Sequence, residues 1–278
     1  MVILWLLACG GTEIEWSTAA QWKEVPGESS WEWILPTEEL PATPPEVDYL
    51  GLDGLDVASS YVAAAADQGS SSWCYLSVGS VEEWRDDYED LLALDDAERD
   101  AGREGIIGNE YSGWAGEWWL NVGAYELFMP IMEARLDVCA DKGFALVEYD
   151  NMEIDPDSGF NTSQAEVEEY VEALLQATKD RGMGGIHKNA TKLVHLEPGF
   201  DALLLEDCVL WDFCAEAQPY LDSGKPVWNA EYPESWDEQG EDFDLETVCS
   251  AGAAVSTLIK TWDLDTNTVV CAAVLAGG

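Results

Sequence analysis

Short apolar runs that alternate with helical patterns constrain the fold of this 278-residue chain more than any other feature. The apolar runs have the length of buried strands, and several of the segments between them carry helix start and stop signals. Such alternation is typical of βα units arranged around a parallel sheet. We predict eight strands, with the ranges Val47–Leu52, Trp73–Val78, Trp118–Val122, Ala145–Asp150, Gly184–Lys188, Ala202–Glu206, Pro226–Glu231 and Val255–Lys260.

The intervening segments contain four helical patterns, at Ser59–Gln68, Val81–Leu94, Pro130–Lys142 and Ser163–Arg181. The third is followed by Gly143, and the fourth starts with the capping-box pair Ser163 and Glu166. Eight strands with helices between them predict an α/β fold, a single (β/α)8 TIM barrel, for which about 250 residues is the usual length. An open doubly wound sheet is the competing topology, but no glycine-rich phosphate loop follows the first strand.

The N-terminal segment has a different composition. Leu6–Cys9 looks like a bacterial lipobox inside the apolar stretch Met1–Gly11, which is too short to span a bilayer. We therefore predict that residues 1–30 are a truncated lipoprotein-type signal and acidic tether with a lipid anchor on Cys9, and that residues 31–278 form the barrel. The protein is then exported, as a bacterial cell-surface lipoprotein or a secreted protein, and contacts a membrane only through the anchor. The alternative is a fortuitously apolar N-terminus.

Charge excludes several classes of partner. The chain has 56 acidic and 12 basic residues, which gives a formal net charge of -44. Nucleic acids and anionic membrane surfaces are excluded because binding phosphate needs a basic patch. Two interpretations of the charge stay open, a solvated acidic surface that resists aggregation and the attraction of a cationic substrate. We expect a monomer.

The chain has seven cysteines, and six remain if Cys9 is the anchor. An even number suits an oxidising compartment. We predict two disulfides, Cys208–Cys214 and Cys249–Cys271, and we expect Cys74 and Cys139 to be buried free thiols. Zinc-type Cys and His spacings are absent from the sequence, so we predict neither a metal nor a cofactor.

Charged residues stand at the ends of several expected strands, where barrel enzymes carry their functional groups. Three strands end in acids, at Asp150, Glu206 and Glu231, and a fourth ends in His187–Asn189. Side chains alternate along a strand, so Glu148 and Asp150 share a face. Each acid taken alone is as well explained by an ion pair or a helix cap, but their position at one end of the barrel favours an active site.

Many short motifs in this chain occur in the same order in one known family. The sequence resembles glycoside hydrolase family 114, the endo-α-1,4-polygalactosaminidases, from about Trp31 to Cys271. The stretches that carry the resemblance are Cys74–Ser80, Glu83–Asp86, Gly113–Leu120, Ile131–Asp137, Lys142–Asn151, His187–Asn189, Leu205–Cys208 and Ala230–Tyr232. The order of so many motifs makes the resemblance far more specific than any one of them.

The resemblance implies a (β/α)8 barrel that cleaves α-1,4-linked galactosamine polymers, with Asp150 and Glu206 as the catalytic carboxylates. Further substrate-binding candidates are Glu148, Asn151, Lys188, Glu231, Tyr232, Tyr75 and Trp114, of which the aromatic residues could stack on sugar faces or pack in the core. The chain departs from the family's pattern beside the pair. The departures are Tyr149, Ala190, Met152–Ile154 and Leu205.

Three functions remain in view. The leading prediction is an endo-acting glycosidase with a two-carboxylate, retaining mechanism. The second is a non-catalytic surface lipoprotein that binds polysaccharide on the same barrel. The third is hydrolysis of a different α-linked glycan by the same pair.

Roles within the pair can also be predicted. Lys188 is expected to contact Glu148 or Asp150 and to favour the ionised carboxylate, so Lys188→Met should lower activity and move the acid limb of the pH–rate profile upward. Glu206 follows the apolar run Leu203–Leu205, which is expected to raise its pKa and suit a general acid. Asp150 is then the nucleophile.

Overall fold

The computed structural model describes residues 29–36, 40–153 and 156–277. Its main sheet has the strand order β1-β2-β3-β7-β8-β9-β10-β11-β12, in which every neighbouring pair is parallel except the last. The strands are β1 Trp31–Ile34, β2 Tyr49–Asp53, β3 Ser71–Ser77, β7 Leu146–Asp150, β8 Gly184–Lys188, β9 Ala202–Glu206, β10 Val227–Glu231, β11 Ser256–Ile259 and β12 Val269–Val270.

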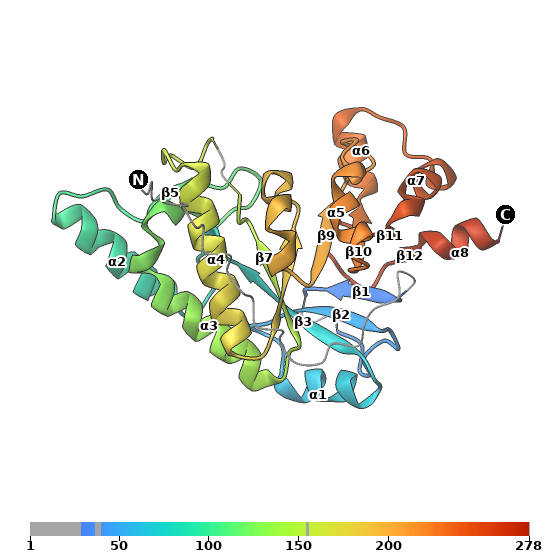
Figure 1. The fold of residues 1–278 in the computed structure, drawn as a ribbon, viewed down its shortest axis with the longest axis horizontal. Coiled ribbons are helices and arrows are strands. Elements are labelled where there is room, and N and C mark those ends of the chain that lie inside the picture. Colours follow the sequence, from blue (N-terminus) through green and yellow to red (C-terminus); the bar gives the residue numbers. More distant parts are fainter. Residues whose placement is uncertain (1–28, 37–39, 154–155, 278) are drawn as a thin grey trace, which may run out of the picture.

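The sheet curls until its two ends approach each other. The indole nitrogen of Trp31 in β1 donates to the backbone oxygen of Ser256 in β11 over 3.2 Å, and the backbone nitrogen of Leu35 donates to Leu264 over 3.2 Å. The helices are α1 Ser59–Asp67, α2 Tyr88–Asp100, α3 Met129–Lys142, α4 Gln164–Asp180, α5 Gln218–Asp222, α6 Pro233–Gln239, α7 Leu245–Ala251 and α8 Cys271–Ala276. Figure 1 shows α1, α3 and α4 along the outside of the curled sheet. The predicted α/β barrel is confirmed.

Alternation along the strands creates two cores. One set of side chains faces the interior of the barrel, where Trp73 and Trp228 stack with ring centroids 4.9 Å apart. Gly51 makes room for them, because a Cβ there would lie 2.3 Å from Trp73. The alternate set packs against the helices, as Tyr149 does on α4, where its hydroxyl donates a hydrogen bond to the carbonyl of Leu174 and accepts one from the hydroxyl of Thr178. Alternate residues of each strand therefore point into the barrel interior, and only these residues can take part in a site there.

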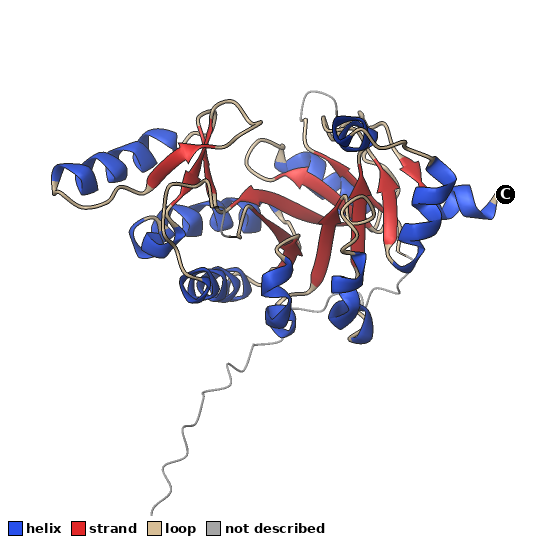
Figure 2. Ribbon diagram, turned by 90° about the horizontal axis from the view of Figure 1, so that it is seen from above, coloured by secondary structure: helices blue, strands red, loops and turns tan. Residues whose placement is uncertain are grey.

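The residues between β3 and α3 in the sequence form a second sheet. It is antiparallel, with the order β4-β6-β5, and consists of β4 Ser80–Glu82, β5 Ile107–Glu110 and β6 Glu117–Leu120. We call residues 80–120, which also include α2, the insertion. Figure 2 shows the insertion at one end of the molecule, opposite the C-terminus.

The insertion corrects two predictions. Trp118–Val122 is not a barrel strand, because its apolar residues belong to β6. The barrel strand that was not predicted is β1. The helix predicted at Val81–Leu94 begins only at Tyr88, because Ser80–Glu82 pairs with β6. A short apolar run has the same pattern in either sheet. Hydrophobic periodicity therefore cannot show whether such a run belongs to the barrel or to the insertion.

The other helical predictions are confirmed. Helix α3 ends at Gly143 with a φ of 90°, and α4 begins with the complete capping box of Ser163 and Glu166. Helix α1 covers nearly all of the predicted Ser59–Gln68.

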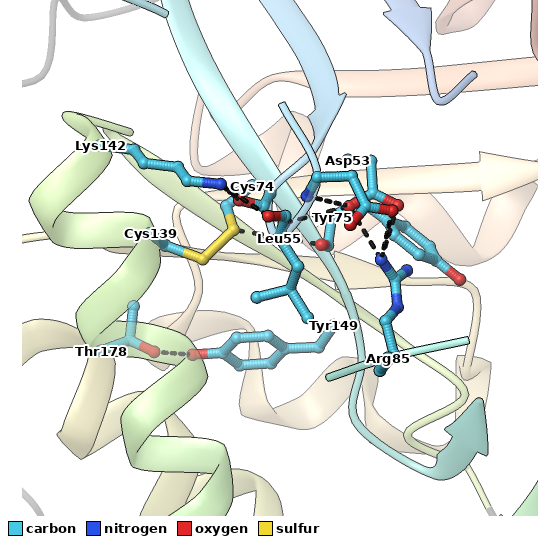
Figure 3. Close-up of a disulfide and its surroundings, with 11 residues drawn as sticks. Asp53, Leu55, Cys74, Tyr75, Arg85, Cys139, Lys142, Tyr149 and Thr178 are labelled. Carbon is cyan, nitrogen blue, oxygen red and sulfur yellow. Dashed lines mark hydrogen bonds and ion pairs between the residues drawn. A yellow bond between two sulfur atoms is a disulfide. The ribbon is translucent and has the colours of Figure 1, made fainter. Parts of the chain in front are cut away.

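Three disulfides join cysteines in the described part of the chain. Cys208–Cys214 and Cys249–Cys271 are paired as predicted. The expectation of free thiols was wrong, because Cys74 on the helix-facing side of β3 is bonded to Cys139 on α3 (Figure 3). Gly54 leaves space for this bond, since a Cβ there would lie 1.8 Å from the sulfur of Cys74. The two cysteines are 65 residues apart, so only the packing of α3 on β3 brings them together.

Removing this disulfide should destabilise the protein more than removing Cys208–Cys214. The chain-entropy model gives a loss of about 4 kcal/mol in the free energy of unfolding for Cys74→Ser with Cys139→Ser, and about 2 kcal/mol for the shorter loop. Denaturant unfolding of the two double variants measures the difference. If Cys74 were alkylated in the unreduced native protein, the pairing would be refuted.

Two further findings concern the membrane. Within the described ranges, no helix is long and apolar enough to cross a bilayer. The lipobox, Cys9 and the tether up to residue 28 lie outside the described residues.

Candidate active site

A cavity of about 590 Å³ opens at the carboxyl ends of the barrel strands. Its floor comes from the barrel and includes Trp33, Tyr75, Asp150, Lys188 and Glu206, and one wall comes from the insertion. This size is typical of a site for a small-molecule or sugar ligand.

Lys188 joins the acidic groups at the centre of the cavity. Its ammonium lies 3.1 Å from Oδ1 of Asp150, 2.8 Å from Oε2 of Glu206 and 3.5 Å from Oε1 of Glu148. The side chain is buried, and its ammonium also lies 4.8 Å from the ring centre of Trp33. Burial alone would lower the pKa of Lys188, but Asp150, Glu206 and Glu148 together hold it well above the usual value. Lys188 is thus a permanent cation shared by three carboxyl groups. The sequence predicted a contact with Glu148 or Asp150 only.

Glu206 lies in a polar network, not in the apolar setting that the sequence suggested. Its Oε1 accepts a hydrogen bond from the hydroxyl of Tyr232 at 2.7 Å, and its Oε2 accepts one from Asn189 at 3.1 Å. Burial would raise the pKa of Glu206, but Lys188 and these donors lower it below the ordinary value. The expectation of a raised pKa was wrong because Lys188 and these donors outweigh burial. Of the preceding leucines, Leu203 and Leu205 pack toward the helices, and Leu204 alone faces the interior.

Asp150 has one donor on each oxygen. Lys188 binds Oδ1, and the hydroxyl of Tyr75 donates to Oδ2 over 3.0 Å. Both Asp150 and Glu206 line the cavity and are partly exposed to it. The two predicted carboxylates are therefore brought together, with their reactive edges open to a ligand.

Glu148 lies beneath this pair and does not line the cavity. It is fully buried, and its Oε2 accepts a hydrogen bond from the indole nitrogen of Trp73 at 2.7 Å. Burial raises the pKa of Glu148 to about 8, although Lys188 opposes this effect. Glu148 therefore holds a proton more readily than an exposed carboxyl group does, and its side chain lies directly below the cavity.

The chain turns sharply after each central residue. Asn151, Asn189 and Asp207 directly follow Asp150, Lys188 and Glu206, and they have φ values of 58°, 49° and 52°. Non-glycine residues seldom occupy this left-handed region, and such strain is concentrated at functional sites. Asn151 also donates to the hydroxyl of Ser77 and to Glu117, which connects the end of β7 to the insertion.

Glu231 does not belong to the cavity, contrary to the prediction. It is fully buried and accepts hydrogen bonds from the backbone nitrogen of Val209, from Asn229 and from Trp236. Ala230 pairs with Glu206 in the sheet, so Glu231 is one residue out of phase and faces the helices. Its contacts brace the loop that follows Glu206. The neighbouring Tyr232 does line the cavity.

The insertion forms one wall of the cavity, and its charged residues Glu82, Arg85 and Glu117 were not predicted from the sequence. Arg85 is held by both oxygens of Asp53 and of Glu82, so its charge is neutralised within the wall. Glu117 accepts hydrogen bonds from Ser80 and Asn151, and burial raises its pKa to about 7. Figure 3 shows the contact between Asp53 and Arg85. Arg85 and Glu117 stand inside family-like stretches and Glu82 stands beside one, but no sequence pattern connects these residues to the barrel mouth.

The cavity is strongly acidic. Nine of its lining residues carry carboxyl groups and two carry permanent cations, Arg85 and Lys188; the acids are Asp53, Asp56, Glu82, Glu117, Asp150, Glu153, Glu206, Asp207 and Asp263. Among the residues with a described position, no group of three or more His, Cys, Asp and Glu side chains could hold a metal ion.

Comparison with known proteins adds to this geometry. The model of glycoside-hydrolase family GH114 matches residues 12–276. A search of curated proteins found no match.

Two solved structures show the likeness in three dimensions. Ega3 from Aspergillus fumigatus, solved in complex with galactosamine, has a TM-score of 0.77 and 27% sequence identity, over 92% of this chain and 100% of that chain. The glycoside hydrolase domain of PelA from Pseudomonas aeruginosa has a TM-score of 0.57 and 17% identity, over 87% of this chain and 98% of that chain. The likeness to PelA shows the fold alone.

Proposed function

Because this chain belongs to glycoside-hydrolase family GH114 and is a glycoside hydrolase, we propose that it cleaves polysaccharides that contain α-1,4-linked galactosamine, at bonds inside the polymer. Asp150 and Glu206 are the catalytic carboxylates, and Lys188 positions both. The observation that carries this proposal is the single ammonium of Lys188 between two carboxylates at the mouth of the barrel.

The charge of the cavity supports an amine-bearing sugar. The amine of galactosamine is protonated at neutral pH, and an acidic cavity raises the local concentration of a cationic chain. The acidic cavity would not raise the local concentration of a neutral or acidic polymer. The relative that is 27% identical to this chain was solved with galactosamine bound, which agrees with this substrate class.

The spacing of the pair supports a retaining mechanism. Oδ1 of Asp150 and Oε2 of Glu206 lie 3.1 Å and 2.8 Å from the same nitrogen, so they are at most about 6 Å apart. Retaining enzymes hold their carboxyl groups about 5–5.5 Å apart, whereas inverting enzymes need about 6.5–9.5 Å to admit a water molecule. One carboxylate then attacks the anomeric carbon to form a glycosyl-enzyme. The other protonates the leaving oxygen and afterwards activates water.

We assign Asp150 as the nucleophile and Glu206 as the acid and base. Donors from Lys188 and Tyr75 keep both oxygens of Asp150 in place for attack. Glu206 is held ionised in the free enzyme, so it must take up a proton before it can act as an acid. Activity on substrates with poor leaving groups therefore needs acidic conditions. The three disulfides suit an oxidising compartment outside the cytoplasm.

Substrate specificity is tested with a panel of defined oligosaccharides. We expect shortening of α-1,4-galactosamine oligomers and a large loss of rate on their N-acetylated counterparts, because acetylation removes the positive charge. Product anomers observed by NMR at early times should keep the α configuration. Binding of galactosamine oligomers without turnover would instead favour a non-catalytic polysaccharide-binding protein, and cleavage of another α-glycan would keep the reaction and change the substrate.

A further inference from the structure

Three tryptophans at the rim of the cavity are unusually exposed. Trp84, Trp114 and Trp262 line the cavity with 51%, 54% and 45% of their surface accessible. Exposed apolar surface that is gathered around a cavity marks a ligand-binding groove, unlike single apolar residues scattered over a surface. Their function is not explained by the carboxylate pair, which lies deeper in the barrel.

The two tryptophans of the insertion are held in place by their backbone. Glu83, next to Trp84, donates its backbone nitrogen to Gly116, and the backbone nitrogen of Trp114 donates to Tyr111. Gly113 and Gly116 flank the second turn with φ values of 96° and 87°. The turns are thus defined before a ligand arrives, which lowers the entropy cost of binding.

Trp262 is fixed from the opposite side. It lies between β11 and β12, and its indole nitrogen donates to the hydroxyl of Ser235 over 3.0 Å. The following Leu264 accepts a hydrogen bond from Leu35, so this turn is tied to the segment after β1. An indole with a satisfied nitrogen and an exposed remainder presents apolar surface to the cavity.

The two groups stand on different sides of the catalytic centre. The insertion follows β3, and Trp262 follows β11, while Asp150 and Glu206 end β7 and β9. Figures 1 and 2 place the insertion and the β11–β12 segment at opposite ends of the molecule, with β7 and β9 between them. A polymer chain that crosses the cavity would therefore meet an aromatic surface on both sides of the bond that is cleaved.

We propose that Trp84 and Trp114 on one side, and Trp262 on the other, form sugar-binding subsites for hexosamine units beyond those that flank the scissile bond. The occupant is the amine-bearing polymer, because an indole face binds both the apolar face of a sugar and a nearby ammonium by a cation–π contact. Acidic residues between these sites complement the same charge. This inference rests on the proposed function. It adds that the activity depends on the length of the polymer substrate.

Chain-length dependence tests the subsites. We would measure kcat/KM on α-1,4-galactosamine oligomers of increasing length for the wild type and for Trp84→Ala, Trp114→Ala and Trp262→Ala. The wild-type value should rise with length and then level off. In each variant, kcat/KM on the longest oligomer should fall about tenfold further than kcat/KM on the shortest. This is the effect expected from the loss of one aromatic side chain that contributes strongly to binding.

Trp211→Ala is the matched control. Trp211 is 56% exposed but does not line the cavity, so its variant should follow the wild-type curve at every length. Isothermal titration of the same oligomers into Asp150→Asn variants, with and without each rim substitution, repeats the test without turnover. The subsites are refuted if the losses are equal at all lengths or if Trp211→Ala loses as much. A wild-type protein that cleaves no galactosamine oligomer would instead overturn the proposed function, and the inference with it.

Discussion

Replacing Asp150 by Asn is expected to lower kcat on galactosamine oligomers by at least about 10⁴-fold while the protein stays folded. An amide cannot form the glycosyl-enzyme, and Glu148 on the same strand face cannot replace it because Glu148 is buried beneath the cavity. Thermal unfolding and circular dichroism check the fold. Residual activity within about tenfold of the wild type would exclude Asp150 from the chemistry.

The partner carboxylate should respond differently to the leaving group. Glu206→Gln is expected to lower kcat by about 10²–10⁴-fold on oligomers, but much less in the first step on an aryl glycoside with a good leaving group, where protonation is less needed. Azide then separates the roles. If azide restores Asp150→Ala with inversion at the anomeric carbon, Asp150 is the nucleophile; the same rescue of Glu206→Ala would reverse the assignment.

Replacing Lys188 by Met is expected to lower kcat/KM by about 10²-fold or more and to shift the pH–rate profile. Without the ammonium at 2.8 Å, the pKa of Glu206 rises, since an opposite charge at this distance lowers the pKa of a carboxyl group by about 1–3 units. Glu206 must be protonated to act as an acid, so activity falls as the pH rises through its pKa. The basic limb of kcat/KM should therefore move to higher pH.

The limb that moves reports the role of Glu206. From the sequence, Lys188 is assigned to Glu148 or Asp150 and its loss is expected to move the acid limb; its closest contact in the structure is Glu206. Movement of the acid limb alone would indicate that Glu206 acts as the ionised nucleophile. Lys225→Met is a suitable control, because Lys225 pairs with Glu197 outside the cavity. An unchanged profile in Lys188→Met would place Lys188 outside the mechanism.

The barrel itself could be predicted because its signals are local. Seven of the eight predicted strand segments overlap barrel strands, and the capping box of Ser163 and Glu166 marks the start of α4 to the residue. A strand or helix imposes its period on consecutive residues, so the pattern survives in the sequence alone. The exceptions were β1 and β6, because a strand of only four residues is too short to show which sheet it joins.

The catalytic candidates were also found at the right strand ends. Asp150 and Glu206 stand where parallel strands finish, and the resemblance to one family selected them from 56 acidic residues. Glu231 satisfied the same local rule and is nevertheless turned toward the helices. Its direction depends on the register between β9 and β10, in which Ala230 and not Glu231 pairs with Glu206.

The sequence by itself determined seven of the barrel strands, the helices α1, α3 and α4, the acidic composition and the position of the candidate pair along the chain, because each depends on neighbours a few residues away. Only the tertiary structure decided that one lysine serves three carboxyl groups, that Cys74 meets Cys139, that the insertion supplies Glu117 to the cavity, and that Glu206 is held ionised. Charge interactions and covalent pairing depend on distances of a few ångströms between groups that are many residues apart. Such distances are fixed by the curl and register of the sheet, which no local pattern encodes.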